Sequence, residues 1–318
     1  MNDDKNVEKK ESIKTLAFRV IKKGESGEEI IRRFFRYYFT DKRVGIVMCV
    51  TGGPAQKTGC GKSYTALRLG EIIDEDFNIQ KVVYTPSEFL RVVDYVEEKG
   101  KTGQVIVVDE GEITAPAQLW YSFTNRAIAY TLATFRYLRS MAIFVVPSLS
   151  WLDKRIRLLT NFVGFTEKTV IGRKVEVYLD LRQVKTDLWG EKIFYSKIRL
   201  LREEDYKLIT LTKLKMSLPS EKLIEKYEEK STEFKKTLRS NLLIEIEKFK
   251  KYEGMSENEL NEIIKKLSEN EYVIDDLTQK KGKVSTSTIR MLCPELPSRT
   301  IHIIKRTLEK MWKGKGDD

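Results

Sequence analysis

The sequence predicts an α/β protein with a mainly parallel sheet, an added antiparallel hairpin and a helical C-terminal region. Three observations support this prediction. Apolar runs of strand length alternate with helical patterns between residues 27 and 147, which is the arrangement of βαβ units. Two runs in which apolar and polar residues alternate follow at 174–184 and 192–201, and they favour a hairpin. Beyond residue 202 the chain is rich in Lys and Glu and has helical periodicity.

The first half of the chain supplies the elements of the parallel sheet. Apolar residues three or four apart, such as Ile30 and Phe34, identify helices, and short apolar runs such as VGIVMCV identify strands. Ser87 is the expected N-cap of its helix, because its hydroxyl can accept hydrogen bonds from the first turn. The expected helices are 27–39, 62–74, 87–98 and 122–139, and the expected strands are 44–50, 81–85, 104–109 and 141–147.

The pattern changes after residue 151. The two alternating runs flank Trp189-Gly190, a plausible turn. A long charged helix is expected at 220–251, where mixed-sign runs such as 225–230 indicate a solvated face. Three short helical patterns follow. We therefore expect an N-terminal arm at 1–25, an α/β domain at 26–201, a charged helical linker at 202–255 and a basic helical domain at 256–318.

The amino-acid composition limits the classes of partner and of functional site that fit this chain. The 318 residues include 58 Lys and Arg against 47 Asp and Glu, a formal net charge of +11 that favours polyanionic partners, nucleic acid first. Residues 280–315 hold ten basic and two acidic residues, which is +8. Three cysteines and one histidine fit neither a disulfide framework nor a Cys/His zinc site, and they indicate a cytoplasmic location. We expect neither a signal peptide nor a membrane span.

The sharpest motif is QKTGCGKS at 56–63, between an expected strand and an expected helix. A glycine-rich turn leaves backbone N–H groups free to face phosphate oxygens, and Lys62 would reach the β- and γ-phosphates. Ser63 would bind Mg²⁺. Gln56 replaces the first glycine of the usual P-loop pattern. We predict an ATP site formed by Thr58, Gly59, Cys60, Gly61, Lys62, Ser63 and Tyr64.

A second motif, VIVVDE at 105–110, ends a strand in two acids. Asp109 would hold Mg²⁺ through water, together with Ser63, and Glu110 would activate the attacking water as general base. Ser148 follows the fourth strand, where a polar residue can sense the γ-phosphate. A turn-forming serine after Pro147 is an equal alternative.

Several arginines lie close in sequence to the fourth expected strand, 141–147. Arg136 and Arg139 share a helix face, and either could stabilise the γ-phosphoryl charge from across a subunit interface. Cations near a helix C-terminus also have a plain dipole explanation. Other arginines of this cluster are Arg126, Arg155 and Arg157.

The C-terminal region has the size of a helix-turn-helix or winged-helix domain. A helix that starts at Ser298 carries basic and apolar positions and could enter a DNA major groove. A small solvated helical bundle is the alternative. The candidate DNA contacts are Lys280, Lys281, Lys283, Arg290, Arg299, Lys305 and Arg306.

Residues 58–63, Asp109-Glu110 and Pro147-Ser148 resemble the HerA/FtsK superfamily of ring-forming ATPases, and the chain is also similar to the related Zot-like morphogenesis proteins. The resemblance covers about residues 43–200. It implies an additional strand in the sheet core, a ring such as a hexamer, an arginine supplied by a neighbour and ATP-driven movement of DNA. The Lys/Ile/Glu-rich composition suits an archaeal or viral source.

We therefore expect an ATP- and Mg²⁺-dependent P-loop ATPase that moves double-stranded DNA as a homo-oligomeric ring. One alternative is a nucleotide-gated DNA-binding protein for partition or replication. Another is a Zot-like assembly ATPase that binds protein or membrane partners.

Overall fold

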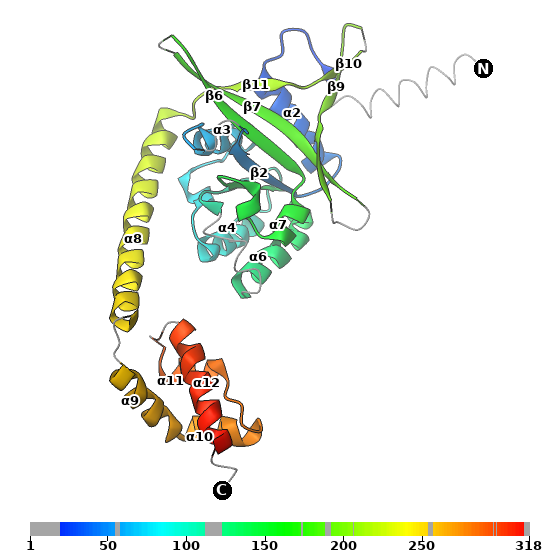
Figure 1. Cartoon of the computed structure of the whole chain (residues 1–318). Coiled ribbons are helices and arrows are strands. Elements are labelled where there is room, and N and C mark those ends of the chain that lie inside the picture. The colour runs from blue at the N-terminus through cyan, green and yellow to red at the C-terminus, as the bar shows by residue number, and fades with distance from the viewer. Residues whose placement is uncertain are drawn as a thin grey trace, which may run out of the picture. The chain divides into compact units, whose positions relative to one another are not determined.

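The computed structural model describes residues 20–54, 58–111, 123–172, 174–187, 192–205, 207–253, 257–294, 296 and 298–314. The chain divides into two compact units, Met1–Lys230 and Ser231–Asp318 (Figure 1). In these ranges no helix is long and apolar enough to cross a bilayer.

Five parallel strands form the centre of the first unit, and the parts of them that pair with one another are largely buried because helices cover both sheet faces. β5 lies between β2 and β4, which confirms the additional strand that the resemblance implies. In sheet order the strands are β6 (Phe162–Ile171), β2 (Ile46–Gly52), β5 (Met141–Val145), β4 (Val105–Val108) and β3 (Val82–Val83).

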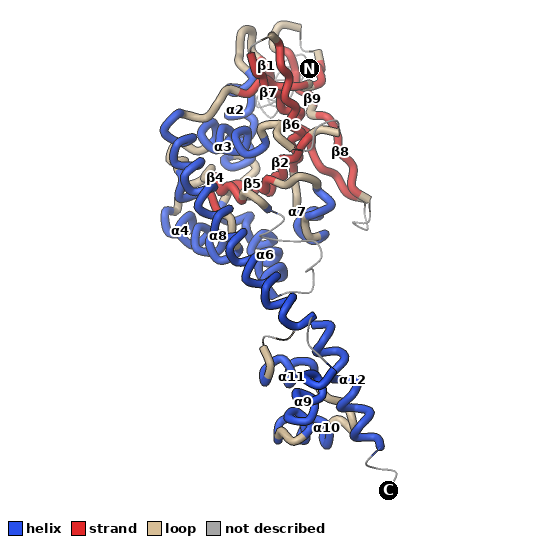
Figure 2. Tube along the Cα trace, turned by 60° about the vertical axis from the view of Figure 1, so that its left-hand side comes forward, coloured by secondary structure: helices blue, strands red, loops and turns tan. Residues whose placement is uncertain are grey.

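Helices pack on the two faces of this sheet, with α2 and α3 on one side and α4, α6 and α7 on the other (Figure 2). The second group buries alternate strand residues such as Val47, Cys49 and Phe144. The helices are α2 (Gly27–Thr40), α3 (Lys62–Ile73), α4 (Pro86–Lys99), α6 (Phe123–Thr134) and α7 (Lys154–Leu159), with a 3₁₀ helix, η4 (Phe135–Leu138), after α6.

Antiparallel strands extend the sheet beyond β6. β7 (Lys174–Thr186) pairs with β6, and both β8 (Ile193–Lys197) and β11 (Lys213–Met216) pair with β7. The predicted hairpin is therefore confirmed as β7–β8, while its turn at 189–190 lies outside the described residues. Residues 199–201, expected at the end of the second strand of the hairpin, pair in a different sheet instead. A separate three-stranded sheet joins β1 (Val20–Ile21), β9 (Arg199–Arg202) and β10 (Leu208–Thr210).

Several expectations need correction. Residues 20–21, expected in a loose arm, form β1, because they pair with β9. β10 and β11 lie where a helical linker was expected, because strands this short depend on their partners and not on local propensity. β6 was not anticipated. Thr85, not Ser87, caps α4, since Pro86 occupies the first helical position and Thr85 accepts the Glu88 N–H.

The second unit contains helices in its described residues. It begins within α8 (Glu221–Glu253), the expected long charged helix, and continues with α9 (Glu257–Ser268), α10 (Glu271–Gln279), α11 (Thr286–Leu292) and α12 (Ser298–Gly314). The helical patterns in the sequence predict α9, α11 and α12 but not α10, which Asn270 caps. The apolar faces of these four helices share one core, which includes Val273, Ile289 and Ile304.

Candidate nucleotide-binding site

The P-loop lies where β2 ends and α3 begins, at the carboxyl edge of the sheet. Gly59 and Gly61 have φ values of +66° and +80°, which glycine adopts without strain. At Gly61 a Cβ atom would lie 3.1 Å from Val177 on β7, so the loop packs closely against the antiparallel extension. Gln56, which replaces the usual first glycine, lies outside the described residues.

β6 anchors the loop through the side chain of Thr166. The Cys60 side chain is fully buried, and the Thr166 hydroxyl donates to its sulfur at 3.2 Å. The same hydroxyl lies 3.1 Å from the Thr51 carbonyl oxygen. Lys62 and Ser63 then form the first turn of α3, where the helix dipole favours an anion.

Ser63 and Asp109 meet although 46 residues separate them. The Ser63 hydroxyl donates to Asp109 Oδ1 at 3.0 Å. Asp109 is 2% exposed and follows β4, and its N–H donates to the Val83 carbonyl at 2.9 Å. Because carboxyl ends of parallel strands share one edge of the sheet, the two predicted metal-binding residues lie together.

Glu110, the predicted general base, follows directly. Its φ of +51° is uncommon for a residue with a side chain. Such backbone conformations cluster at functional sites, where the surrounding structure enforces them. The conformation directs the chain away from the strand immediately after Asp109, so the two acids occupy different surroundings: Asp109 is buried and Glu110 is half-buried.

A cavity of about 420 Å³ opens above the P-loop. Its polar wall is the loop itself, from Gly59 to Tyr64, and its apolar wall comes from Val175 and Val177 of β7. Two further lining residues, Tyr227 and Glu228, come from the start of α8. Sequence analysis assigned residues 225–230 to a solvated helix face, and for Tyr227 this was wrong, since only 4% of this residue is exposed.

Tyr227 contacts the predicted metal site directly. Its hydroxyl donates to Asp109 Oδ2 at 2.6 Å. Burial, and then the Asp109 charge, raise the pKa of the Tyr227 phenol above its usual value, so the phenol stays protonated and acts as donor. Next to it, the Tyr64 hydroxyl donates to Glu228 at 2.8 Å, and the Tyr64 and Tyr227 rings pack edge to face, with centroids 6.1 Å apart. Burial and the Glu228 contact raise the pKa of Tyr64.

The predicted arginines lie elsewhere. Arg136 and Arg139 are at the amino edge of the sheet, where Ile46 N–H donates to Ser140 and Gly103 N–H to Arg139. The P-loop is at the opposite edge, so these two side chains could reach phosphates only in another copy of the chain. Arg155, by contrast, forms an ion pair at 3.1 Å with buried Asp153, which caps α7.

Ser148 follows β5 at the carboxyl edge. Its hydroxyl lies 3.0 Å from that of Ser150, and it precedes a short 3₁₀ helix, Leu149–Trp151, without making a side-chain cap. This geometry suits a turn residue, and it leaves the sensor role as a proposal.

These side chains suit a Mg²⁺–nucleotide complex. A hydroxyl and a carboxylate converge, a lysine begins the adjoining helix, and loop N–H groups surround the cavity, which are the groups that phosphates and Mg²⁺ require. Within the part of the chain that the structure describes, no group of three or more His, Cys, Asp or Glu residues offers another metal site.

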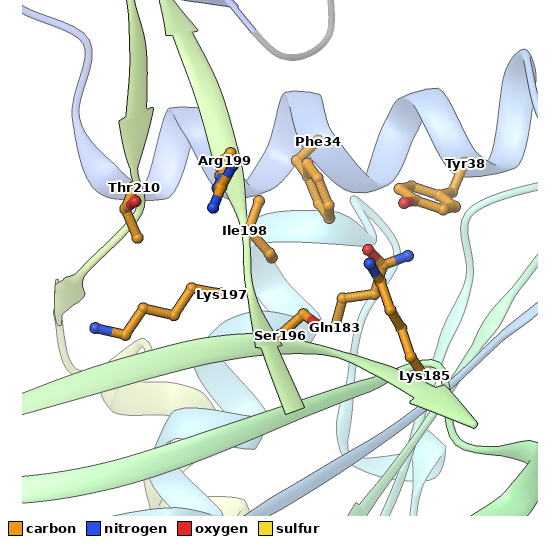
Figure 3. Close-up of a pocket in the computed structure, with 9 residues that line it drawn as sticks. All are labelled: Phe34, Tyr38, Gln183, Lys185, Ser196, Lys197, Ile198, Arg199 and Thr210. Carbon is orange, nitrogen blue, oxygen red and sulfur yellow. The ribbon is translucent and has the colours of Figure 1, made fainter. Parts of the chain in front are cut away.

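A second cavity, of about 600 Å³, lies between α2 and strands β7 to β10 (Figure 3). Its lining includes three cations, Lys185, Lys197 and Arg199, and no carboxylate. Phe34 and Ile198 form an apolar floor. Because three cations and no carboxylate line it, the cavity is suited to an anion.

The predicted DNA contacts lie on the second unit. Lys281, Lys283, Arg290 and Arg306 are exposed, whereas Lys280 pairs with Asp276, and Lys305 lies 3.8 Å from Glu309. On α12, Ile301, Ile304 and Leu308 face the core, and Arg306 lies on the exposed face. The side chain of Arg299 is outside the described set.

Comparisons with known proteins give weak similarities. No family model and no curated protein match the sequence. Among solved structures, the chain is similar to the N-terminal domain of zonular occludens toxin from Neisseria meningitidis, at 17% identity and a TM-score of 0.32, over 49% of this chain and 95% of the other. It is also similar to the genome packaging NTPase B204 from Sulfolobus turreted icosahedral virus 2, at 11% identity and a TM-score of 0.28, over 50% and 98%. Because both TM-scores are below 0.5, the P-loop NTPase fold rests on the strand order and loop of this chain itself.

Proposed function

We propose that this chain binds ATP with Mg²⁺ at the P-loop and hydrolyses it. The observation that carries the proposal is the 3.0 Å hydrogen bond between Ser63 and Asp109, which joins the start of α3 to the end of β4. Two residues 46 positions apart meet at the one place where a P-loop needs metal ligands. The backbone N–H groups of 59–63 and the Lys62 ammonium would hold the phosphates.

The chemistry assigned to each residue follows from its position. Bound Mg²⁺ would neutralise charge on the transferred phosphoryl group. Ser63 and Asp109 would hold its coordination shell, Lys62 would stabilise charge on the phosphates, and Glu110 would accept a proton from the attacking water. Ser148 at the carboxyl edge would contact the γ-phosphate.

We further propose that hydrolysis drives movement of double-stranded DNA by a ring of identical chains in the cytoplasm. Exposed cations on the second unit support DNA contact, as does the α11–α12 pair, which resembles a helix-turn-helix with α12 as the reading helix. The cationic cavity of the first unit offers a second surface for phosphates. The position of Arg136 and Arg139 at the far edge of the sheet supports a role across a subunit interface, not within one chain.

Two rival functions make different predictions. A nucleotide-gated DNA-binding regulator would hydrolyse ATP slowly and prefer one DNA sequence. A Zot-like assembly ATPase would hydrolyse ATP without any response to DNA. The basic second unit favours the two functions that involve DNA over the third.

The proposal is tested by the ATPase rate with and without double-stranded DNA, beside the molar mass from light scattering. We expect hydrolysis that DNA stimulates and a mass several times 37.1 kDa. Lys62→Ala should abolish turnover while the circular dichroism spectrum is unchanged. Unchanged hydrolysis in Lys62→Ala would refute the P-loop assignment. An ATPase rate that belongs to a monomer and does not change when DNA is added would refute the proposal of a DNA motor.

A further inference from the structure

The start of α8 reaches the metal side of the nucleotide site from a segment 118 residues beyond Asp109. We propose that Tyr227 and Glu228 form an intramolecular stop, by which we mean a contact that blocks the site until Mg²⁺–nucleotide displaces it. This inference rests on the proposed function. The Tyr227 phenol donates to an Asp109 oxygen that waters of a bound Mg²⁺ would need, and Glu228 places a negative charge beside the phosphate loop.

Both carboxylate oxygens of Asp109 accept hydrogen bonds. Oδ1 accepts from Ser63 at 3.0 Å and Oδ2 accepts from Tyr227 at 2.6 Å. Mg²⁺ requires six oxygen ligands at about 2.0–2.1 Å and keeps several waters, which would donate to Asp109. The phenol and those waters need the same acceptor in the same small volume.

The Glu228 carboxylate lies at the cavity that nucleotide phosphates would enter. Glu228 lines the cavity together with Lys62 and the loop glycines, and Tyr64 holds it there at 2.8 Å. A triphosphate brings several negative charges into this space. Like charges within a few ångströms of each other repel, and water weakens this repulsion in part because Glu228 is exposed. Withdrawal of Glu228 would therefore favour nucleotide binding even without a metal.

Polar contacts and two buried side chains hold the start of α8 in place. Tyr227 is its link to Asp109, and Lys230 contacts the Val82 carbonyl and the Tyr84 ring. Upstream, the Ser217 hydroxyl donates to Glu28 at 2.6 Å, and Ser220 N–H donates to Glu71. Leu223 and Tyr227 are buried, and the Lys230 contact is partly buried, whereas the Ser217 and Ser220 contacts are exposed. Because so few buried side chains hold this segment, we expect that it detaches without unfolding of the sheet.

Tyr227→Phe tests the stop, because it removes one hydroxyl and keeps the ring. The probe is ADP, titrated by calorimetry with and without Mg²⁺. We expect Tyr227→Phe to bind Mg²⁺–ADP at least about 10-fold more tightly than wild type, the scale of a hydrogen bond to a charged group, with little change for ADP alone. Glu228→Gln should tighten binding of ADP in both conditions.

The matched control is Tyr137→Phe. Its hydroxyl also donates to a carboxylate, Glu97, at 2.7 Å, but it lies on η4, away from the P-loop. This variant should bind ADP as wild type does. A second readout follows α8 itself: amide hydrogen exchange at 221–230 should become faster in nucleotide-free Tyr227→Phe, and in wild type when Mg²⁺–ADP is added.

Failure of this inference and failure of the proposed function would give different results. Equal or weaker Mg²⁺–ADP binding by Tyr227→Phe, with α8 exchange unchanged by Mg²⁺–ADP, would overturn the stop and leave the nucleotide site standing. Absence of nucleotide binding in wild type and in both variants would overturn the proposed function and this inference with it.

Discussion

Removal of the Lys81 charge should destabilise the first unit strongly. Lys81 and Asp74 form a buried ion pair, with Nζ and Oδ2 2.6 Å apart and exposures of 1% and 6%. Asp74 Oδ2 also accepts the Val105 N–H at 3.0 Å, and Oδ1 accepts the Asp76 N–H at 3.0 Å. Asp74 therefore ties the end of α3, the P-loop helix, to the start of β4, the strand that ends at Asp109.

The magnitude follows from what Lys81→Met leaves behind. The thioether fills much of the space of the lysine stem, so the main loss is the ammonium partner. The Asp74 carboxylate would remain in the interior with two backbone donors but no counter-charge. Breaking a buried pair on one side costs about 3–5 kcal/mol. With a urea m-value of about 3 kcal/mol/M, the midpoint should fall by about 1–2 M.

Urea unfolding followed by tryptophan fluorescence measures this shift, because three of the four tryptophans (Trp120, Trp151 and Trp189) precede residue 231. Lys101→Met is the control, since the ion pair of Lys101 with Asp76 is exposed and such pairs contribute little. A midpoint for Lys81→Met that matches the control would show that the buried pair does not hold α3 to β4. Addition of Asp74→Asn to Lys81→Met should recover part of the loss, because it removes the unpaired charge.

Three further predictions concern the proposed function. Glu110→Gln should bind ATP normally yet hydrolyse it at least about 10²-fold more slowly in a single-turnover assay, since it loses the proton acceptor. A mixture of Arg136→Ala and Lys62→Ala subunits should recover ATPase activity that neither has alone, because each supplies what the other lacks. Arg290→Ala with Arg306→Ala should lower the slope of log affinity for DNA against log salt by about 2, from two lost phosphate contacts.

Each of these has a contrary outcome. Normal single-turnover hydrolysis by Glu110→Gln would transfer the role of base to another residue. Failure of the mixed subunits to recover activity, once co-assembly is shown by light scattering, would make Arg136 a structural residue. An unchanged salt slope would show that the exposed cations of the second unit are only a solvated surface.

The sequence alone determined the centre of the first unit. Local patterns identified the strands and helices around β2, α3 and β4, because apolar periodicity and a glycine-rich turn are properties of neighbouring residues. Even the meeting of Ser63 and Asp109 could be predicted, since parallel strands bring their carboxyl ends to one edge. The cap of α4 was misplaced by two residues, because Pro86 decides the helix start more strongly than a hydroxyl two positions later.

Only the tertiary structure decided which distant segments complete the site. Tyr227 lies in a Lys/Glu-rich helix whose local pattern resembles a solvated face, and its burial exists only because the start of α8 packs beside the P-loop. The strands β6, β10 and β11 are recognised only from the strands with which they pair. Arg136 is assigned to the amino edge of the sheet only from the order of the strands. Periodicity reports which face of an element is apolar, whereas contacts across a hundred residues depend on strand order and register, which neighbouring residues do not encode.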